Sequence, residues 1–120
     1  MVTEERIRES EEGTFIFFNQ ILGLSQKNPE AYKELTEKTI ETNGRIQYHL
    51  EMATVADSKE VFVDHINHIR EIDETMKAEF TKYDIFMNKL TIDEALESGY
   101  NSLIKLLPKA IEFGIITSPR

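Results

Sequence analysis

Three histidines and one glutamate are the side chains whose types and spacing point most directly to chemistry. Glu11 falls inside the apolar stripe of the first expected helix, and His65 falls near the centre of the stripe of the third. If the helices alternate in direction, the helical rise places Glu11, His49 and His65 at similar heights, roughly 10 to 12 Å above one end of the bundle. His68 lies one turn above His65, at the edge of its stripe.

A carboxylate and two or three imidazoles inside a helical bundle have two interpretations. Glu11, His49, His65 and His68 suit a zinc, iron or manganese ion, because the chain has no cysteine to supply thiolate ligands. They suit equally a hydrogen-bonded polar layer that sets the register of the helices. We favour the polar layer, without a cofactor, since neither a His-Glu-x-x-His nor a Glu-x-x-His motif occurs. A divalent-metal site is the alternative.

Other patterns of catalytic residues are missing from the sequence. The serines lie outside any glycine elbow, and the glycines are isolated rather than gathered in a phosphate-binding loop. Thr39, Thr42 and Asn43 form a second polar patch, which we expect to be satisfied by hydrogen bonds to the preceding turn. The sequence therefore favours a non-catalytic protein and leaves an enzymatic role open.

Helices must position these residues. The first is expected over residues 3–24, where side chains on one face recur at steps of three and four: Ile7, Glu11, Thr14, Phe15, Phe18, Ile21 and Leu22. Asn28 and Pro29 predict the start of a second helix that ends near Ala56. A third begins after Ser58 and keeps helical spacing to Leu90, so we expect one continuous helix in preference to a break near Thr81.

The last expected helix begins at a capping box formed by Thr91 and Glu94. Pro108 either kinks this helix or opens a short final helix that Gly114 ends, leaving residues 115–120 as a tail. No segment shows the period-two alternation of a strand. We therefore predict an all-α protein, a single domain over residues 1–120, folded as an antiparallel up-down-up-down four-helix bundle.

Composition narrows the possible partners. The chain has 120 residues and a net charge of -8, from 22 acidic and 14 basic residues. Nucleic acids and anionic membrane surfaces attract clustered lysine and arginine, so neither is an expected partner. No apolar run approaches the roughly 18 residues of a membrane span, and the first residues lack the pattern of a signal peptide. These features predict a cytoplasmic protein.

Association is the function that the sequence favours. Five apolar residues lie off the main stripes near the same end of the expected bundle: Ile16, Phe17, Leu24, Ile85 and Phe86. An exposed patch of a few hundred Å² usually marks an interaction surface. We therefore predict a protein that acts through self-association, as a closed homo-oligomer, or through an unidentified protein partner. A metal- or small-ligand-binding bundle, with the Glu11 and histidine layer as its site, is the alternative.

The chain begins Met-Val-Thr-Glu-Glu-Arg-Ile-Arg and carries only Arg45 and Arg70 in its middle. With its Lys, Glu and Ile-rich helices, it resembles small archaeal proteins whose left-handed four-helix bundles are similar to cobalamin adenosyltransferases. Those enzymes bind ATP through a Gly/Thr-rich N-terminal segment and an Arg-rich helix, and neither element is present here. The resemblance therefore implies a fold and no site residues, and adenosyl transfer is not expected.

Overall fold

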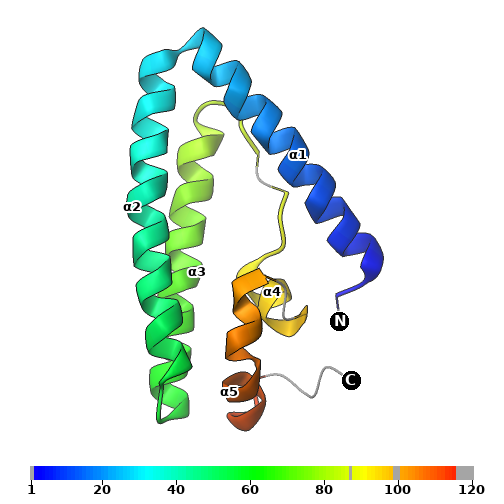
Figure 1. The fold of residues 1–120 in the computed structure, drawn as a ribbon, viewed down its shortest axis with the longest axis vertical. Helices are drawn as coiled ribbons and strands as arrows, with labels where there is room; N and C mark the ends of the chain where they lie inside the picture. Colours follow the sequence, from blue (N-terminus) through cyan, green and yellow to red (C-terminus); the bar gives the residue numbers. More distant parts are fainter. Residues whose placement is uncertain (1, 87, 99–100, 116–120) are drawn as a thin grey trace.

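Three long helices are followed by a short helical segment in the computed structural model, which describes residues 2–86, 88–98 and 101–115 (Figure 1). Among these residues no strand occurs, so the all-α prediction is confirmed. In chain order the elements are α1 (Glu4–Lys27), α2 (Pro29–Thr54), α3 (Lys59–Thr81), α4 (Ile92–Ser98), the 3₁₀ helix η1 (Asn101–Leu106) and α5 (Leu107–Glu112). Of the predicted tail, residues 116–120 lie outside the described residues.

The helix starts are capped by the side chains that the sequence indicates. Asn28 Oδ1 accepts a hydrogen bond from the Ala31 N–H at 3.2 Å, and Ser58 Oγ accepts one from the Val61 N–H at 3.2 Å. At α4 the capping box is complete, because Thr91 Oγ1 accepts from the Glu94 N–H and Glu94 Oε1 accepts from the Thr91 N–H. Each contact satisfies a backbone donor that the helix leaves free.

The prediction of a continuous third helix to Leu90 is wrong, because α3 ends at Thr81. Asp84 adopts a left-handed conformation with φ 59°. The Asp84 N–H then donates to the Thr81 carbonyl, and the Ile85 N–H donates to the Phe80 carbonyl. This paired arrangement is the Schellman motif, and the contact of Ile85 with Phe80 in one core cluster completes it.

The prediction of one long fourth helix is also wrong. The segment consists of α4, η1 and α5, and Tyr100, which we expected on its apolar face, lies outside the described residues. Pro108 stands in the first turn of α5, and Gly114 follows that helix with φ 71°. The alternative in which Pro108 opens a short final helix that Gly114 ends is therefore confirmed.

Two separate clusters form the core around the antiparallel pair α2 and α3. The lower cluster joins the lower halves of both helices to α4, η1 and α5, with Phe62, Ile69, Leu96 and Leu106 as its most fully buried large side chains. The upper cluster packs α1 against the other end of the pair: Phe17, Ile21, Leu24, Leu35, Met76, Phe80, Tyr83 and Ile85. Buried apolar side chains thus hold α1 against α2 and α3 near the α1–α2 connection.

The predicted four-helix bundle is not the observed architecture. Helix α1 diverges from α2 towards its N-terminus, and the segment between α3 and α4 runs through the space that a bundle would close (Figure 1). The radius of gyration is 15.7 Å, whereas a compact domain of this length has about 13.6 Å. The physical cause is the early end of α3, which returns an extended segment between α1 and α3 in place of a fourth long helix.

Candidate functional site

Helix α1 is attached to the extended segment through one of its faces. The Gln20 side chain accepts a hydrogen bond from the Phe86 N–H at 3.2 Å, and Ser10 Oγ accepts one from the Leu90 N–H at 3.1 Å. Between them, Gly13 lets the backbone approach closely, because a Cβ there would clash with the Asn88 carbonyl and lie 2.9 Å from the Asn88 Cβ. Side chains on α1 thereby satisfy backbone donors that a continuous third helix would have satisfied itself.

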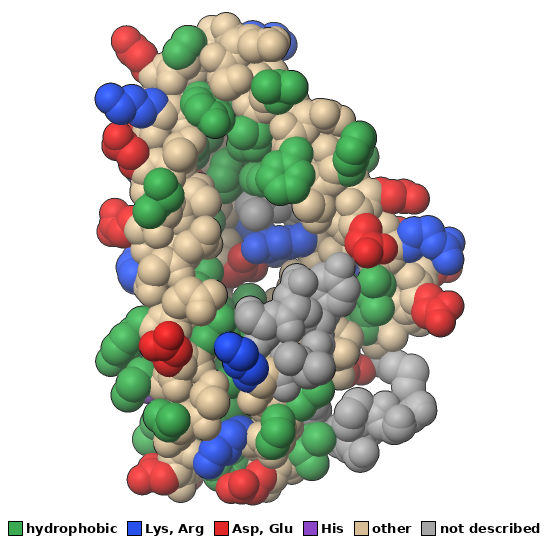
Figure 2. Space-filling model, in the orientation of Figure 1, with side chains coloured by type: hydrophobic (Ala, Val, Ile, Leu, Met, Phe, Trp, Pro, Cys, Tyr) green, Lys and Arg blue, Asp and Glu red, His purple; other side chains and the backbone are tan. Residues whose placement is uncertain are grey.

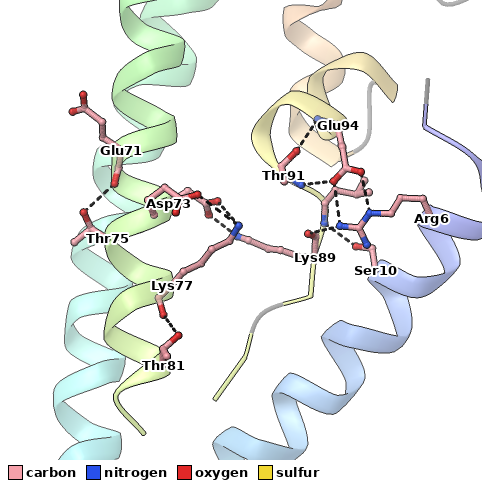
Figure 3. Close-up of polar contacts among 12 residues, drawn as sticks. Arg6, Ser10, Glu71, Asp73, Thr75, Lys77, Thr81, Lys89, Thr91 and Glu94 are labelled. Atoms are coloured by element: carbon pink, nitrogen blue, oxygen red, sulfur yellow. Dashed lines mark hydrogen bonds and ion pairs between the residues drawn. The ribbon is translucent and has the colours of Figure 1, made fainter. Parts of the chain in front are cut away.

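Arg6 extends this attachment to the start of α4. Its guanidinium donates to both carboxylate oxygens of Glu94, at 2.9 and 3.1 Å, and to the Lys89 carbonyl at 3.0 Å (Figure 3). The hydrogen bonds from Arg6 and from the Thr91 backbone lower the pKa of Glu94 to about 2. The same pair raises the pKa of Arg6. Glu94 is therefore ionised throughout the neutral range, and the bidentate pair fixes the N-terminal end of α1.

A buried carboxylate attaches the other side of the segment to α3. Asp73 is 5% exposed, and its oxygens lie 3.1 Å from Lys89 Nζ and 3.6 Å from Lys77 Nζ (Figure 3). Lys77 comes from α3 itself, whereas Lys89 belongs to the extended segment. A buried carboxylate needs such partners, because an uncompensated charge in the interior is costly. Asp73 and Arg6 thus connect the extended segment, residues 85–86 and 88–91, to α3 on one side and to α1 on the other. We call this segment the strut.

The strut leaves an open groove between α1 and the α2–α3 pair. Its upper part is apolar, about 200 Å³ in volume, and is lined by Phe18, Ile21, Tyr32 and Ile40 among others. Its lower part, about 630 Å³, is lined by a mixture of apolar and polar side chains, and the polar ones include Glu11, Asn43, Gln47 and Asp73. Figure 2 shows hydrophobic side chains gathered in the upper hollow, with a basic side chain beneath them.

The side of α1 next to this groove carries an apolar stripe that stays largely exposed among the described residues. Phe15 is 69% exposed, Phe18 63% and Leu22 59%. Their spacing of three and four residues places them on one helical face, beside the Ile21 position that packs into the upper core. The sequence assigned this stripe to the interior of a bundle, and the structure leaves half of it uncovered.

Three of the five residues of the predicted interaction patch are buried or partly buried rather than exposed. Ile85 is buried, and Phe17 and Leu24 pack against the upper core cluster, where the Phe17 and Phe80 rings meet at 5.0 Å between centroids. Ile16 and Phe86 are more than half exposed and line a common hollow beside Gly13. The difference arises because the strut, rather than a fourth helix, covers the face of α1 that carries Phe17.

The structure brings His49, His65 and His68 together and leaves Glu11 apart. His49 Nδ1 lies 2.9 Å from His65 Nδ1, and the His49 and His68 rings stack with centroids 4.8 Å apart. Glu11 lines the groove instead, among residues that include no histidine. Within the described part of the chain, no three His, Asp or Glu side chains form a group that could hold a metal ion. The four-residue set predicted from the sequence is thus divided between two sites.

The second polar patch behaves as an ordinary part of a helix where its contacts are seen. Thr39 Oγ1 donates to the Leu35 carbonyl at 2.8 Å, as expected for a threonine that bonds to the preceding turn. Asn43 lines the lower part of the groove.

Sequence reasoning missed the residues that hold the strut. Arg6, Ser10, Gly13 and Gln20 lie with Phe17 at steps of three and four, so they belong to a second face of the first helix. That spacing is the signal that could have found them, although their polar and small side chains do not mark a buried face. Asp73 likewise follows Ile72 and Ile69 on the inner face of α3.

Comparison of the chain with protein-family models, with curated proteins and with solved structures finds no match to any of them. The resemblance to adenosyltransferase-like bundles is therefore supported only so far as the chain is a small all-helical protein. None of the helices in the described ranges is long and apolar enough to cross a membrane.

Proposed function

We propose that this protein acts through self-association, and that two copies pair through the exposed stripe of α1 defined by Phe15, Phe18 and Leu22. The observation that supports this proposal is the division of α1 into two apolar faces, of which one packs against the upper core cluster and the other is more than half exposed in the part of the chain that the structure describes. An exposed stripe of this kind on a helix at the edge of a groove favours a helical partner.

The exposed area is close to what a specific interface needs. Taking about 200 Å² for a large apolar side chain, Phe15, Phe18, Leu22, Tyr32 and Ile40 together expose roughly 600 Å² in each copy. A stable interface buries about 800 Å² on each partner. Polar residues at the rim of the stripe would supply the remainder, so a second copy of the chain is large enough to cover the patch.

Charge favours an antiparallel pairing of the two α1 helices. The N-terminal half of α1 holds five glutamates against Arg6 and Arg8 and is therefore net acidic, whereas Lys27 is the only charged residue after Glu12 in this helix. Parallel helices would bring the acidic halves together, while antiparallel helices place each acidic half beside the other copy's uncharged half. A two-fold axis near Phe18 then sets Phe15 against Leu22 of the second copy, in a closed interface.

Light scattering coupled to size-exclusion chromatography, at loading concentrations from 1 to 200 µM, tests this proposal. We expect the wild-type mass to rise from 13.9 kDa to twice that value as the concentration increases. Phe18→Glu should remain monomeric, because a carboxylate in the seam cannot be desolvated. Ile16→Glu is the matched control, since Ile16 is similarly exposed on another face of the same helix, and it should dimerise like the wild type.

Two results would overturn the proposal. A wild-type protein that stays monomeric at every concentration would remove self-association, and equal disruption by Ile16→Glu and Phe18→Glu would move the interface away from the stripe. Circular dichroism of each variant confirms that the helices are retained.

A further inference from the structure

All three histidines of the chain meet on one side of the α2–α3 pair. His49 lies in α2, and His65 and His68 lie in α3. His49 is the central member, with His65 Nδ1 at 2.9 Å and the His68 ring stacked at 4.8 Å between centroids. The Tyr48 ring packs edge-on against His49, 5.1 Å between centroids. The cluster is independent of the groove and of the exposed stripe of α1.

The separation of the two Nδ1 atoms is compatible with two kinds of bridge. A hydrogen bond needs one Nδ1 to carry a proton and the other to present a lone pair. A metal ion needs both Nδ1 atoms to present lone pairs, with both protons on Nε2. Metal–nitrogen bonds of about 2.0–2.1 Å bring two ligand nitrogens to roughly 2.9–3.4 Å of each other at bond angles of about 90–110°. The observed 2.9 Å between His49 Nδ1 and His65 Nδ1 lies at the lower end of that range, where the bond angle at the metal is near 90°.

We propose that His49 and His65 form a two-histidine site for a transition-metal ion of the class that prefers imidazole, such as Zn²⁺, Ni²⁺ or Cu²⁺. The ion takes the place of the shared proton and is ligated by Nδ1 of both rings, with water in its other positions. The proton that leaves Nδ1 moves to Nε2 of the same ring, so this exchange of tautomers balances the protons without any release to solvent.

The third histidine of the cluster does not share this geometry. His68 is oriented differently, because its Nε2 lies 3.6 Å from Asp64 Oδ2 and its ring is stacked face to face on His49. It therefore packs against the site rather than acting as a third ligand.

Titration of the full-length protein with ZnCl₂ tests the site directly. Long-range ¹H–¹⁵N NMR reports each imidazole nitrogen separately, so it needs no substitution. We expect Nδ1 of His49 and His65 to shift on addition of one equivalent of Zn²⁺, with the proton on Nε2 in both rings of the bound state, and we expect the signals of the His68 nitrogens to move little.

Isothermal titration calorimetry of variants gives the second measurement. His49→Ala and His65→Ala should each weaken Zn²⁺ binding by about tenfold or more, whereas His68→Ala should change it by less than about threefold. Glu11→Ala is the matched control for the set predicted from the sequence and should bind as the wild type does. Equal losses for all three histidines, or shifts in the NMR spectrum at His68 instead of His65, would contradict the two-histidine assignment. The absence of any imidazole shift at millimolar Zn²⁺ would exclude the site altogether.

The outcome is distinguishable from that of the proposed function. Zn²⁺ binding is measured on the monomeric Phe18→Glu variant as well, which retains the α2–α3 pair, and its affinity should equal that of the wild type.

Discussion

The two apolar faces of α1 have similar residues and opposite surroundings. Phe17 and Leu24 pack into the upper core, while Phe15, Phe18 and Leu22 on the adjacent face are more than half exposed. The difference comes from the strut, whose backbone is held by Ser10, Gly13 and Gln20 along the first face only. Hydrophobicity alone therefore does not decide which face of α1 is covered. The polar and small residues on one face also matter, because they hold the strut against that face.

The largest expected difference between the faces concerns Phe17 and Phe18. Phe17→Ala removes a ring that meets Phe80 in the upper core, and we expect a loss of about 2–3 kcal/mol in the free energy of unfolding. Phe18→Ala should change it by less than about 0.5 kcal/mol, since that ring has mainly solvent around it in the monomer. Urea denaturation at a protein concentration low enough to keep the chain monomeric measures both. Similar losses for the two variants would contradict the division of α1.

Two glycines in α1 sharpen the comparison. Gly13→Ala gains helix propensity but forces the Asn88 backbone away, and we expect a net loss of about 1–2 kcal/mol. Gly23→Ala meets no atom within 4 Å of the new Cβ and should stabilise the protein by up to about 1 kcal/mol. Thermal unfolding of both variants decides the question, and stabilisation by Gly13→Ala would show that the strut does not approach α1 closely.

The ion pair that ends the strut contributes a smaller, pH-dependent effect. Arg6→Ala should cost about 1 kcal/mol at neutral pH, because a partly exposed bidentate pair is lost. The pKa of Glu94 is lowered from 4.5 to about 2 in the folded protein, so the stabilisation is complete above pH 4.5 and disappears as the pH falls towards 2. Unfolding midpoints of wild type and variant, compared from pH 2 to 7, should therefore converge at the acidic end. A constant difference over this range would assign the effect to packing instead.

Local signals in the sequence predicted the starts of the helices and one of their ends. Asn28, Ser58 and the Thr91–Glu94 box cap helices where expected, and Gly114 ends α5. The end of α3 escaped prediction because Asp84, not glycine, takes the left-handed conformation there. Aspartate tolerates that conformation through its short polar side chain, but it occurs as readily on any exposed helical surface.

Because the end of α3 was not predicted, the architecture and the buried face of α1 were predicted wrongly as well. A continuous third helix implies a closed bundle, in which Phe15 and Phe18 are buried and Phe17 is exposed. Ending the helix at Thr81 sends residues 85–86 and 88–91 along the other face of α1 and reverses these assignments. Within the candidate metal site, the proximity of His49 and His65 followed from the antiparallel α2–α3 pair alone, which was predicted correctly. The place of Glu11 could not be predicted in the same way, because it depends on the position of α1, which in turn depends on the strut.

The most direct test of the two-faced helix is ¹⁹F NMR of protein labelled with fluorophenylalanine at its seven Phe positions, recorded from 5 to 500 µM. Single Phe→Leu variants assign the resonances. We predict that the Phe15 and Phe18 signals shift with concentration as the second copy covers them, while those of Phe17, Phe62 and Phe80 stay fixed because these rings already pack in the core of each copy. Concentration-dependent shifts at Phe17 with none at Phe18, or no shift at any position, would contradict the assignment of the open face of α1 to self-association.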